Sequence, residues 1–262
     1  MSKPNPNLWV AVYDMHYPAI DWPTFHALMD FIKTNKKNIE GFIFGGDALD
    51  NAEISHHTKS KPMLRPTGSY LRNHINFSRL ILDPIEAELP KTARRIWIDG
   101  NHEHWAQQAV ESQPELEGLI ENNKLLALED RGWEYHPCGT RIKLGKLNVI
   151  HGETLTGTGN QASAYHAKKA VDIYAGSVLY GHLHTHQSYT RILPHDVKQK
   201  WVAVCSPILG RTNPHYLRNR PTGWTNGFTV IEMQPDGNFN LYPIIVSGGK
   251  FSFGGVTYGG KP

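Results

Sequence analysis

Five short apolar segments, each followed within a few residues by Asp, Asn or His, constrain the fold of this chain more than any other feature. The segments cover residues 8–13, 41–45, 94–98, 147–150 and 177–180. Their lengths and apolar content predict buried β-strands. Ligands of open α/β sheets bind beyond the carboxyl ends of strands, so the polar residues after these segments are expected to gather at one edge.

The order of the remaining patterns predicts the fold class. Helical periodicity covers residues 22–37, 70–89, 161–174 and most of 103–130, and further strands are expected at 134–136, 141–144, 187–192, 200–204, 228–233 and 239–246. A βαβαβα half followed by a β-rich half predicts an α/β sandwich with two sheets. We expect one domain over residues 1–262, with 187–262 as a β-rich C-terminal part of the second sheet. In helix 70–89, Leu71, Ile75, Leu82 and Ile85 are expected to face inward.

Composition excludes several classes of protein. Hydrophobic residues make up 39% of the 262 residues and the net charge is only +3, so a disordered chain is excluded. No apolar run is long enough to span a bilayer, and the polar N-terminus does not resemble a signal peptide, so we expect a cytoplasmic protein with no membrane partner. Two cysteines cannot form a Cys-based zinc site, whereas 15 histidines suggest imidazole ligands.

The polar residues at the segment ends are of the types that bind divalent metal ions. They supply carboxylate, amide and imidazole donors without a thiolate, which suits Mn, Fe, Zn, Ni or Mg. Seven ligands exceed the need of one catalytic ion, but they suit two ions that share a carboxylate. The candidate ligands are Asp14, His16, Asp47, Asn101, His151, His182 and His184.

Each motif alone has an ordinary structural explanation, since Asp-x-His matches many sequences and Gly-Asn-His is common in turns. The conjunction is specific, because five motifs occur in order, each after an apolar strand. They are Asp14-Met15-His16, Gly46-Asp47-Ala48-Leu49-Asp50, Gly100-Asn101-His102-Glu103, His151-Gly152 and Gly181-His182-Leu183-His184.

With these motifs the sequence resembles the calcineurin-like metallophosphoesterases. The resemblance covers residues 14–184, and the spacing further resembles phage-encoded members, which would act in the host cytoplasm. It implies a four-layer αββα sandwich, in which two packed mixed β-sheets are flanked by helices.

The resemblance also implies a role for each motif residue. Two divalent ions are implied, with Mn²⁺ expected first and Fe, Zn, Ni or Mg as alternatives. A metal-bridging hydroxide would attack phosphorus, His102 would protonate the leaving oxygen as general acid, and Asp50 would orient His102. One ion would be held by Asp14, His16, Asp47 and His184, and the other by Asp47, Asn101, His151 and His182.

The expected function is therefore hydrolysis of a phosphate ester, preferentially as a phosphodiesterase or nuclease on DNA, RNA or a nucleotide. Protein phosphatases of this family continue Gly-Asp-x-x-Asp with Arg-Gly, where this chain has Asn51-Ala52, so that phosphate-clamping arginine is missing. Two alternatives stay open, a phosphomonoesterase acting on a protein or small molecule and a catalytically silent metal-binding protein. His102 and Asp50 argue against the second, because neither is an implied ligand.

Substrate contacts are expected from loops around the strand ends. His56, His57 and Arg65 follow the second motif, and Arg211 follows a late strand. They would contact an anionic substrate, although a solvated polar loop explains the first three equally well. Residues 216–224 combine Arg218 and Arg220 with Trp224, for which an ordinary basic loop is the favoured explanation.

Overall fold

The computed structural model of the chain describes residues 7–55, 69–155, 165–214, 217 and 220–260. Its larger sheet has the strand order β11-β10-β1-β2-β3-β4. Strands β1 to β4 run parallel, whereas β10 and β11 are antiparallel additions at one side. The bounds are β1 Asn7–Val12, β2 Ile39–Phe44, β3 Arg94–Ile98, β4 Glu134–His136, β10 Gly227–Met233 and β11 Phe239–Ile245.

The second sheet has the order β5-β6-β7-β9-β8 and is also mixed, because β6, β7 and β9 are parallel and both edge strands are antiparallel. A separate hairpin, β12-β13, lies beside the first helix. The bounds are β5 Ile142–Leu144, β6 Leu147–Val149, β7 Ser177–Tyr180, β8 Gln187–Leu193, β9 Asp196–Cys205, β12 Lys250–Phe253 and β13 Val256–Gly259.

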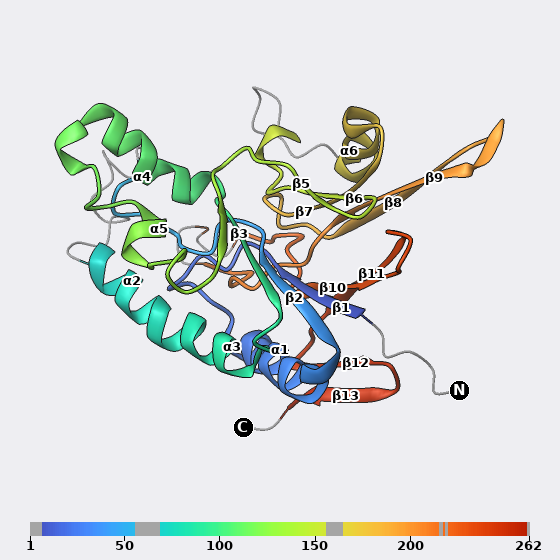
Figure 1. Ribbon diagram of the computed structural model, residues 1–262, viewed down its shortest axis with the longest axis horizontal. Coiled ribbons are helices and arrows are strands. Elements are labelled where there is room, and N and C mark those ends of the chain that lie inside the picture. Colours follow the sequence, from blue (N-terminus) through green and yellow to red (C-terminus); the bar gives the residue numbers. More distant parts are fainter. Residues whose placement is uncertain (1–6, 56–68, 156–164, 215–216, 218–219, 261–262) are drawn as a thin grey trace.

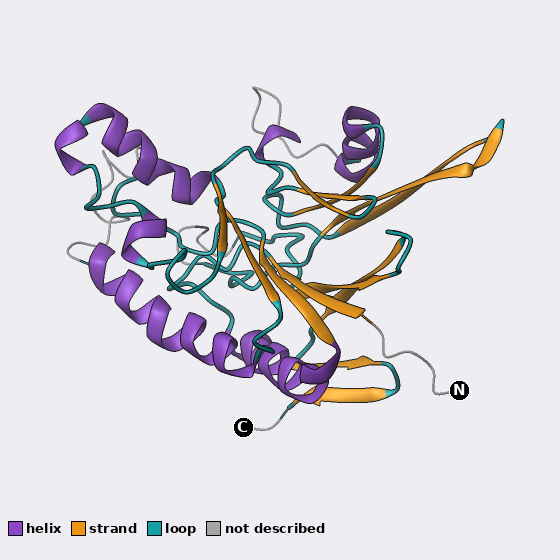
Figure 2. Cartoon of the chain, in the orientation of Figure 1, coloured by secondary structure: helices purple, strands orange, loops and turns teal. Residues whose placement is uncertain are grey.

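Helices cover the outer faces of both sheets (Figures 1 and 2). Helices α1 to α3 pack on the first sheet, and α6 packs on the second. Asp21 caps the N-terminus of α1, accepting from the Thr24 N–H at 3.0 Å. The bounds are α1 Trp22–Asn35, α2 Tyr70–Phe77, α3 Asp83–Glu88, α4 Asn101–Ser112, α5 Asn122–Leu125 and α6 His166–Tyr174.

Three apolar clusters correspond to the three interfaces of a four-layer structure. One lies between the first sheet and its helices and includes Phe31 and Trp97. The second lies between the sheets, where Tyr13 and Leu179 are buried, and the third lies under α6. The expected fold class, two packed mixed sheets flanked by helices, is confirmed.

The assignment of residues 187–262 to the second sheet is wrong for its later strands. Only β8 and β9 join that sheet, whereas β10 pairs with β1 and carries β11 at the edge of the first sheet. The first five residues of β10 are buried, with Phe228 in the outer core and Ile231 in the inter-sheet core. Such a strand fits inside either sheet by pattern alone, and only its antiparallel pairing with β1 decides between them.

The inward face of the helix after residue 70 also differs from expectation. Leu82 and Ile85 are fully buried, but Leu71 and Ile75 are 56% and 50% exposed. A π-helical segment, Ser78–Leu82, separates α2 from α3. Its wider turn shifts the side-chain register, so a 3.6-residue period cannot be continued through it. Over the described residues, no helix combines the length and apolarity needed to cross a membrane.

Candidate functional site

The strand ends of both sheets meet at one edge, where polar side chains are buried. Strands β1 and β2 lead to Asp14 and Asp47, β3 leads to Asn101, and β6 and β7 lead to His151 and His182. Asp14 is fully buried, and Asp47 and His151 are each 1% exposed. Buried carboxylates are costly unless positive charge or hydrogen bonds compensate them, so this edge needs partners for its acids.

The backbone around the candidate ligands is held in an uncommon conformation. Left-handed φ costs free energy for a non-glycine residue. The backbone N–H of Asp14 donates to Gly46 O at 3.1 Å, and that of His16 donates to Asp47 O at 2.8 Å, which helps to hold this conformation. Strain of this kind clusters at functional sites. The φ values are 50° at Asp14, 48° at His16, 52° at Asp47, 67° at His182 and 60° at His184.

One candidate metal-binding group consists of Asp14, His16 and His184, whose ligand atoms lie within 4.8 Å of one another. His16 Nε2 is 3.1 Å from His184 Nε2, and the latter is 3.4 Å from Asp14 Oδ1. Trp224 packs edge-on against His184, with 4.3 Å between the ring centroids. Two imidazole nitrogens and a carboxylate oxygen that converge in this way form a donor set suited to a divalent ion.

A second group, which we call the Asp47 group, consists of Asp47, His151 and His182. His151 Nε2 lies 3.4 Å from Asp47 Oδ2 and 3.2 Å from Asn101 Oδ1. His151 Nδ1 lies 3.0 Å from the Gly45 carbonyl, to which it must donate, so in the neutral ring Nε2 carries the lone pair. His182 Nδ1 is buried without a hydrogen-bond partner in the described residues.

Asp47 belongs to the second group and also lies close to the first. Its Oδ2 is 3.4 Å from His151 Nε2 on one side and 3.9 Å from His16 Nε2 on the other. The structure thus brings all seven candidate ligands together, with Asp47 in the position that a shared carboxylate requires. These donors fit two divalent ions.

The charges at the site favour cations. Burial alone would raise the pKa of Asp47, but His102 and His151 together hold it well below its usual range. Burial lowers the pKa of His151 and of His102, yet Asp47 raises these pKa values to about 10 and about 9. In the metal-free protein, protons on these imidazoles balance carboxylate charge that metal ions can balance instead.

His102 and Asp50 lie beside the Asp47 carboxylate. His102 Nδ1 is 2.7 Å from the Asp50 backbone carbonyl and 3.2 Å from Asp50 Oδ1, while Nε2 is 3.8 Å from Asp47 Oδ2. Asp50 Oδ1 is also 3.4 Å from His16 Nδ1, a contact that the motif did not indicate. Burial would raise the pKa of Asp50, but hydrogen bonds with His102 and His16 lower it. The Asp50 carboxylate is therefore placed to orient both rings.

Two glycines permit the close approach of these loops. A Cβ at Gly46, where φ is +105°, would lie 2.2 Å from His151 Nδ1. A Cβ at Gly100 would lie 2.1 Å from Asp47 Oδ1. Any side chain at either position would displace a candidate ligand.

The sequence missed several residues that support the site. Glu103 accepts hydrogen bonds from three backbone N–H groups, Trp105 packs on His102 at 4.1 Å between ring centroids, and Asn51 donates to the His102 carbonyl. Glu103 is part of the Gly-Asn-His-Glu motif, but the motif predicts no role for it. Asn51 stands where related protein phosphatases have an arginine, which does not predict its contact with His102. No sequence pattern predicts the packing of Trp105.

The expected substrate contacts are only partly visible. His56, His57 and Arg65 lie outside the described residues. Arg211 is exposed, and its backbone N–H donates to Ala19 O at 2.8 Å. It follows Gly210, where a Cβ would meet the Asp14 carbonyl at 2.8 Å, so the chain at Arg211 runs beside the first group.

No protein-family model matches the chain, and no curated protein sequence matches it. Among solved structures it is similar to a conserved uncharacterized protein of Streptococcus pneumoniae TIGR4, a predicted phosphoesterase, at 10% identity over 97% of each chain and a TM-score of 0.40. It is also similar to Vps29 of Entamoeba histolytica in complex with Zn²⁺, at 12% identity over 94% and 96% of the chains and a TM-score of 0.44. Vps29 of Cryptosporidium parvum matches at 10% identity over 92% and 98%, with a TM-score of 0.39. Similarities this low carry no functional conclusion, which depends on the geometry above.

Proposed function

We propose that the chain is a dinuclear metal-dependent phosphoesterase that hydrolyses phosphodiesters of a nucleic acid or nucleotide. The observation that carries the proposal is the position of Asp47 between two groups of imidazole and carboxylate ligands. Two divalent ions held there would supply Lewis-acid charge and an activated water for displacement at phosphorus. Mn²⁺ is the first ion to test, with Fe, Zn, Ni and Mg as alternatives.

His102 performs the proton chemistry in this proposal. Its Nδ1 is held by Asp50, so Nε2 is the nitrogen that faces the site. An imidazolium there can hold a phosphate oxygen and donate its proton to the leaving alkoxide. Cations bound at Asp47 would offset the carboxylate charge that raises the pKa of His102 in the metal-free protein.

The test is hydrolysis of bis-p-nitrophenyl phosphate beside p-nitrophenyl phosphate, using chelator-stripped protein with Mn²⁺ added back. We expect metal-dependent turnover of the diester, a loss of at least 100-fold in Asp47→Ala, and no change in the exposed control Asp130→Ala. Undiminished turnover in Asp47→Ala would reject the proposal. Turnover of the monoester alone would support a phosphomonoesterase, and His102→Gln with unchanged turnover would remove the general-acid role.

A further inference from the structure

A large cleft opens between the two sheets, away from the candidate metal ligands. Its volume is about 1080 Å³, and its walls come from residues of β8, β9 and β11. The floor is formed at the starts of β6 and β7, including Lys146, Asn148 and Ser177. His151 and His182 follow the opposite ends of the same two strands, so the cleft and the metal site are distinct. We call this space the inter-sheet cleft.

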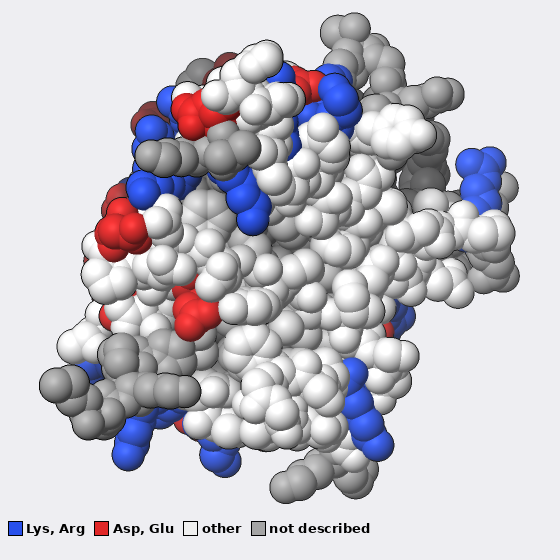
Figure 3. Space-filling view, turned by 90° about the vertical axis from the view of Figure 1, so that its right-hand side faces the viewer, with Lys and Arg blue, Asp and Glu red and all other residues white. Residues whose placement is uncertain are grey.

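The charged residues that line the inter-sheet cleft are all cationic, and the carboxylates of Glu232 and Asp236 lie behind the lining, hydrogen-bonded to Asn240, Tyr242 and Asn238. Four cationic residues line the cleft, Arg141, Lys143, Lys146 and Lys200, and among the described lining residues none is acidic. None of these four forms an ion pair with a described residue, and Lys146 only donates to Asn238 Oδ1 at 2.9 Å. Figure 3 shows the side of the molecule that lies at the right in Figure 1, where basic side chains and some acidic ones are scattered around a largely uncharged surface. Unpaired cations in a concave surface attract a polyanion.

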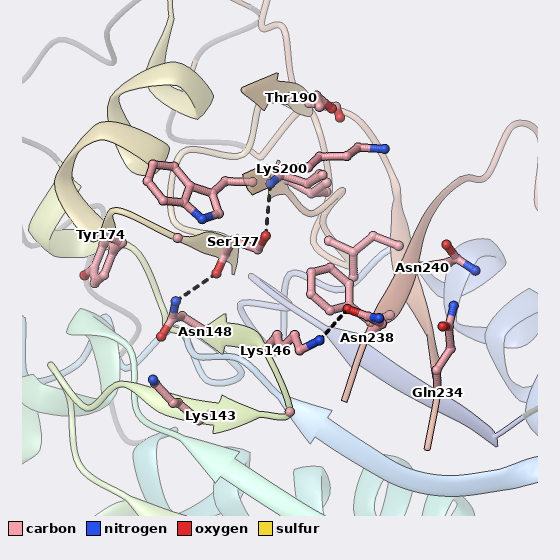
Figure 4. Close-up of a pocket in the computed structure, with 18 of the residues that line it drawn as sticks. Lys143, Lys146, Asn148, Tyr174, Ser177, Thr190, Lys200, Gln234, Asn238 and Asn240 are labelled. Atoms are coloured by element: carbon pink, nitrogen blue, oxygen red, sulfur yellow. Dashed lines mark hydrogen bonds between the residues drawn. The ribbon is translucent and has the colours of Figure 1, made fainter. Parts of the chain in front are cut away.

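A buried amide forms part of the floor. Asn148 is 6% exposed, and its Nδ2 donates to the Ser177 carbonyl at 2.9 Å (Figure 4), which fixes the orientation of the amide. Its Oδ1 is buried with no hydrogen-bond partner among the described residues. Because this oxygen is closed off from the cleft, contacts with an occupant come from the four exposed cationic residues around the floor.

Further amides and an apolar wall narrow the class of ligand. Gln234, Asn238 and Asn240 lie on one side (Figure 4), and Phe239 lines the cleft beside them. Amide side chains bind base edges, aromatic rings stack with bases, and lysines contact phosphates. The volume exceeds that needed for a single phosphate and is at the upper end for ligand pockets.

We infer that the inter-sheet cleft binds a segment of single-stranded nucleic acid, with phosphates on Lys143, Lys146 and Lys200. The choice of a nucleic acid over other polyanions rests on the proposed function. The cleft would hold the chain of the substrate at a distance from the metal site.

The test measures binding of a fluorescein-labelled 12-nucleotide single strand by fluorescence anisotropy. EDTA is present so that metal-dependent hydrolysis does not occur. The cleft variant carries three substitutions, Lys143→Ala, Lys146→Ala and Lys200→Ala. It is compared with a control variant of the same net charge. The control variant replaces three exposed lysines elsewhere, Lys33, Lys91 and Lys124, with alanine. We expect at least tenfold weaker binding in the cleft variant and less than a twofold change in the control. Three phosphate contacts predict a slope of roughly −2 for log K against log salt in the wild-type chain, reduced toward zero in the cleft variant.

Equal weakening in both variants, or none in the cleft variant, would overturn the inference. Inorganic polyphosphate that displaces the strand at matched charge would overturn the choice of nucleic acid. The two proposals fail separately. If the strand binds but no metal-dependent diester turnover is seen, only the proposed function is rejected. If the diester is turned over and the cleft variant binds the strand as tightly as wild type, only the inference that the inter-sheet cleft binds nucleic acid is rejected.

Discussion

Glu103 holds together the two loops that present Asp47 and Asn101. It is 1% exposed; its Oε2 accepts from the backbone N–H of Asp47 and of Gly100, both at 2.9 Å, and its Oε1 accepts from that of Leu49 at 2.8 Å. Burial and the nearby Asp47 and Asp99 raise the pKa of Glu103 to about 8, against the opposing effect of these hydrogen bonds. One side chain thus fixes the position of the shared carboxylate relative to the loop after β3.

Replacing Glu103 with Gln should loosen this arrangement without changing its size. One oxygen becomes an amide group that faces a backbone N–H, which leaves a buried donor unsatisfied and costs about 1–3 kcal/mol. We expect urea unfolding at pH 9, where Glu103 is ionised because its pKa is about 8, to show this loss, and calorimetry to show weaker Mn²⁺ binding. The exposed Glu117→Gln is the matched control. A Glu103→Gln protein with wild-type stability and Mn²⁺ affinity would contradict the positioning role.

At the residue scale, the convergence of the candidate ligands was predictable from the sequence, and the residues that support them were not. Asp14, His151 and His182 each follow an apolar strand, and parallel strands place such residues at one edge. Glu103 and Asn51 act through contacts more than 50 residues away, Glu103 on Asp47 and Asn51 on the His102 carbonyl. Such contacts depend on how the loops meet and leave no periodic signal in the sequence.

At the scale of the elements, the helical stretch from α2 through α3 shows where sequence periodicity no longer predicts which side chains are buried. The helix was expected correctly, but the π-helical segment changes which residues contact the sheet. Phe77 and Ile81 are fully buried, in place of the expected Leu71 and Ile75. The same limit applies to β10, whose sheet is decided by pairing with β1 and not by its own composition.

Two substitutions in this stretch test the shifted register. Ile85→Ala removes a fully buried side chain and should destabilise the protein by about 2–5 kcal/mol. Ile75→Ala removes a half-exposed one and should change stability by less than about 0.5 kcal/mol. Urea unfolding of the two variants beside wild type measures both. Equal losses would mean that the helix keeps a regular α-helical register through residues 78–82.

For the molecule as a whole, the candidate metal site lies where the two sheets meet. Asp14 and Asp47 follow strands of the first sheet, and His151 and His182 follow strands of the second. Ions bound by both sets would connect the two halves of the sandwich, and no such connection exists in the unfolded chain. Metal binding should therefore raise the free energy of unfolding of the whole molecule.

Thermal unfolding with and without Mn²⁺ measures this coupling. Free metal at 100 times its dissociation constant should add about 2.7 kcal/mol at 25 °C. The midpoint temperature of unfolding should rise in the wild-type protein when Mn²⁺ is added. It should rise much less in Asp47→Asn, because this change weakens both halves of the site at once. The exposed Asp130→Asn is the control. The effect should weaken as pH falls, because binding must displace a proton from His151, whose pKa in the metal-free protein is raised to about 10 by Asp47 against the lowering effect of burial. An equal rise in Asp47→Asn would place the ions elsewhere, and a rise independent of pH would mean that His151 is not a ligand.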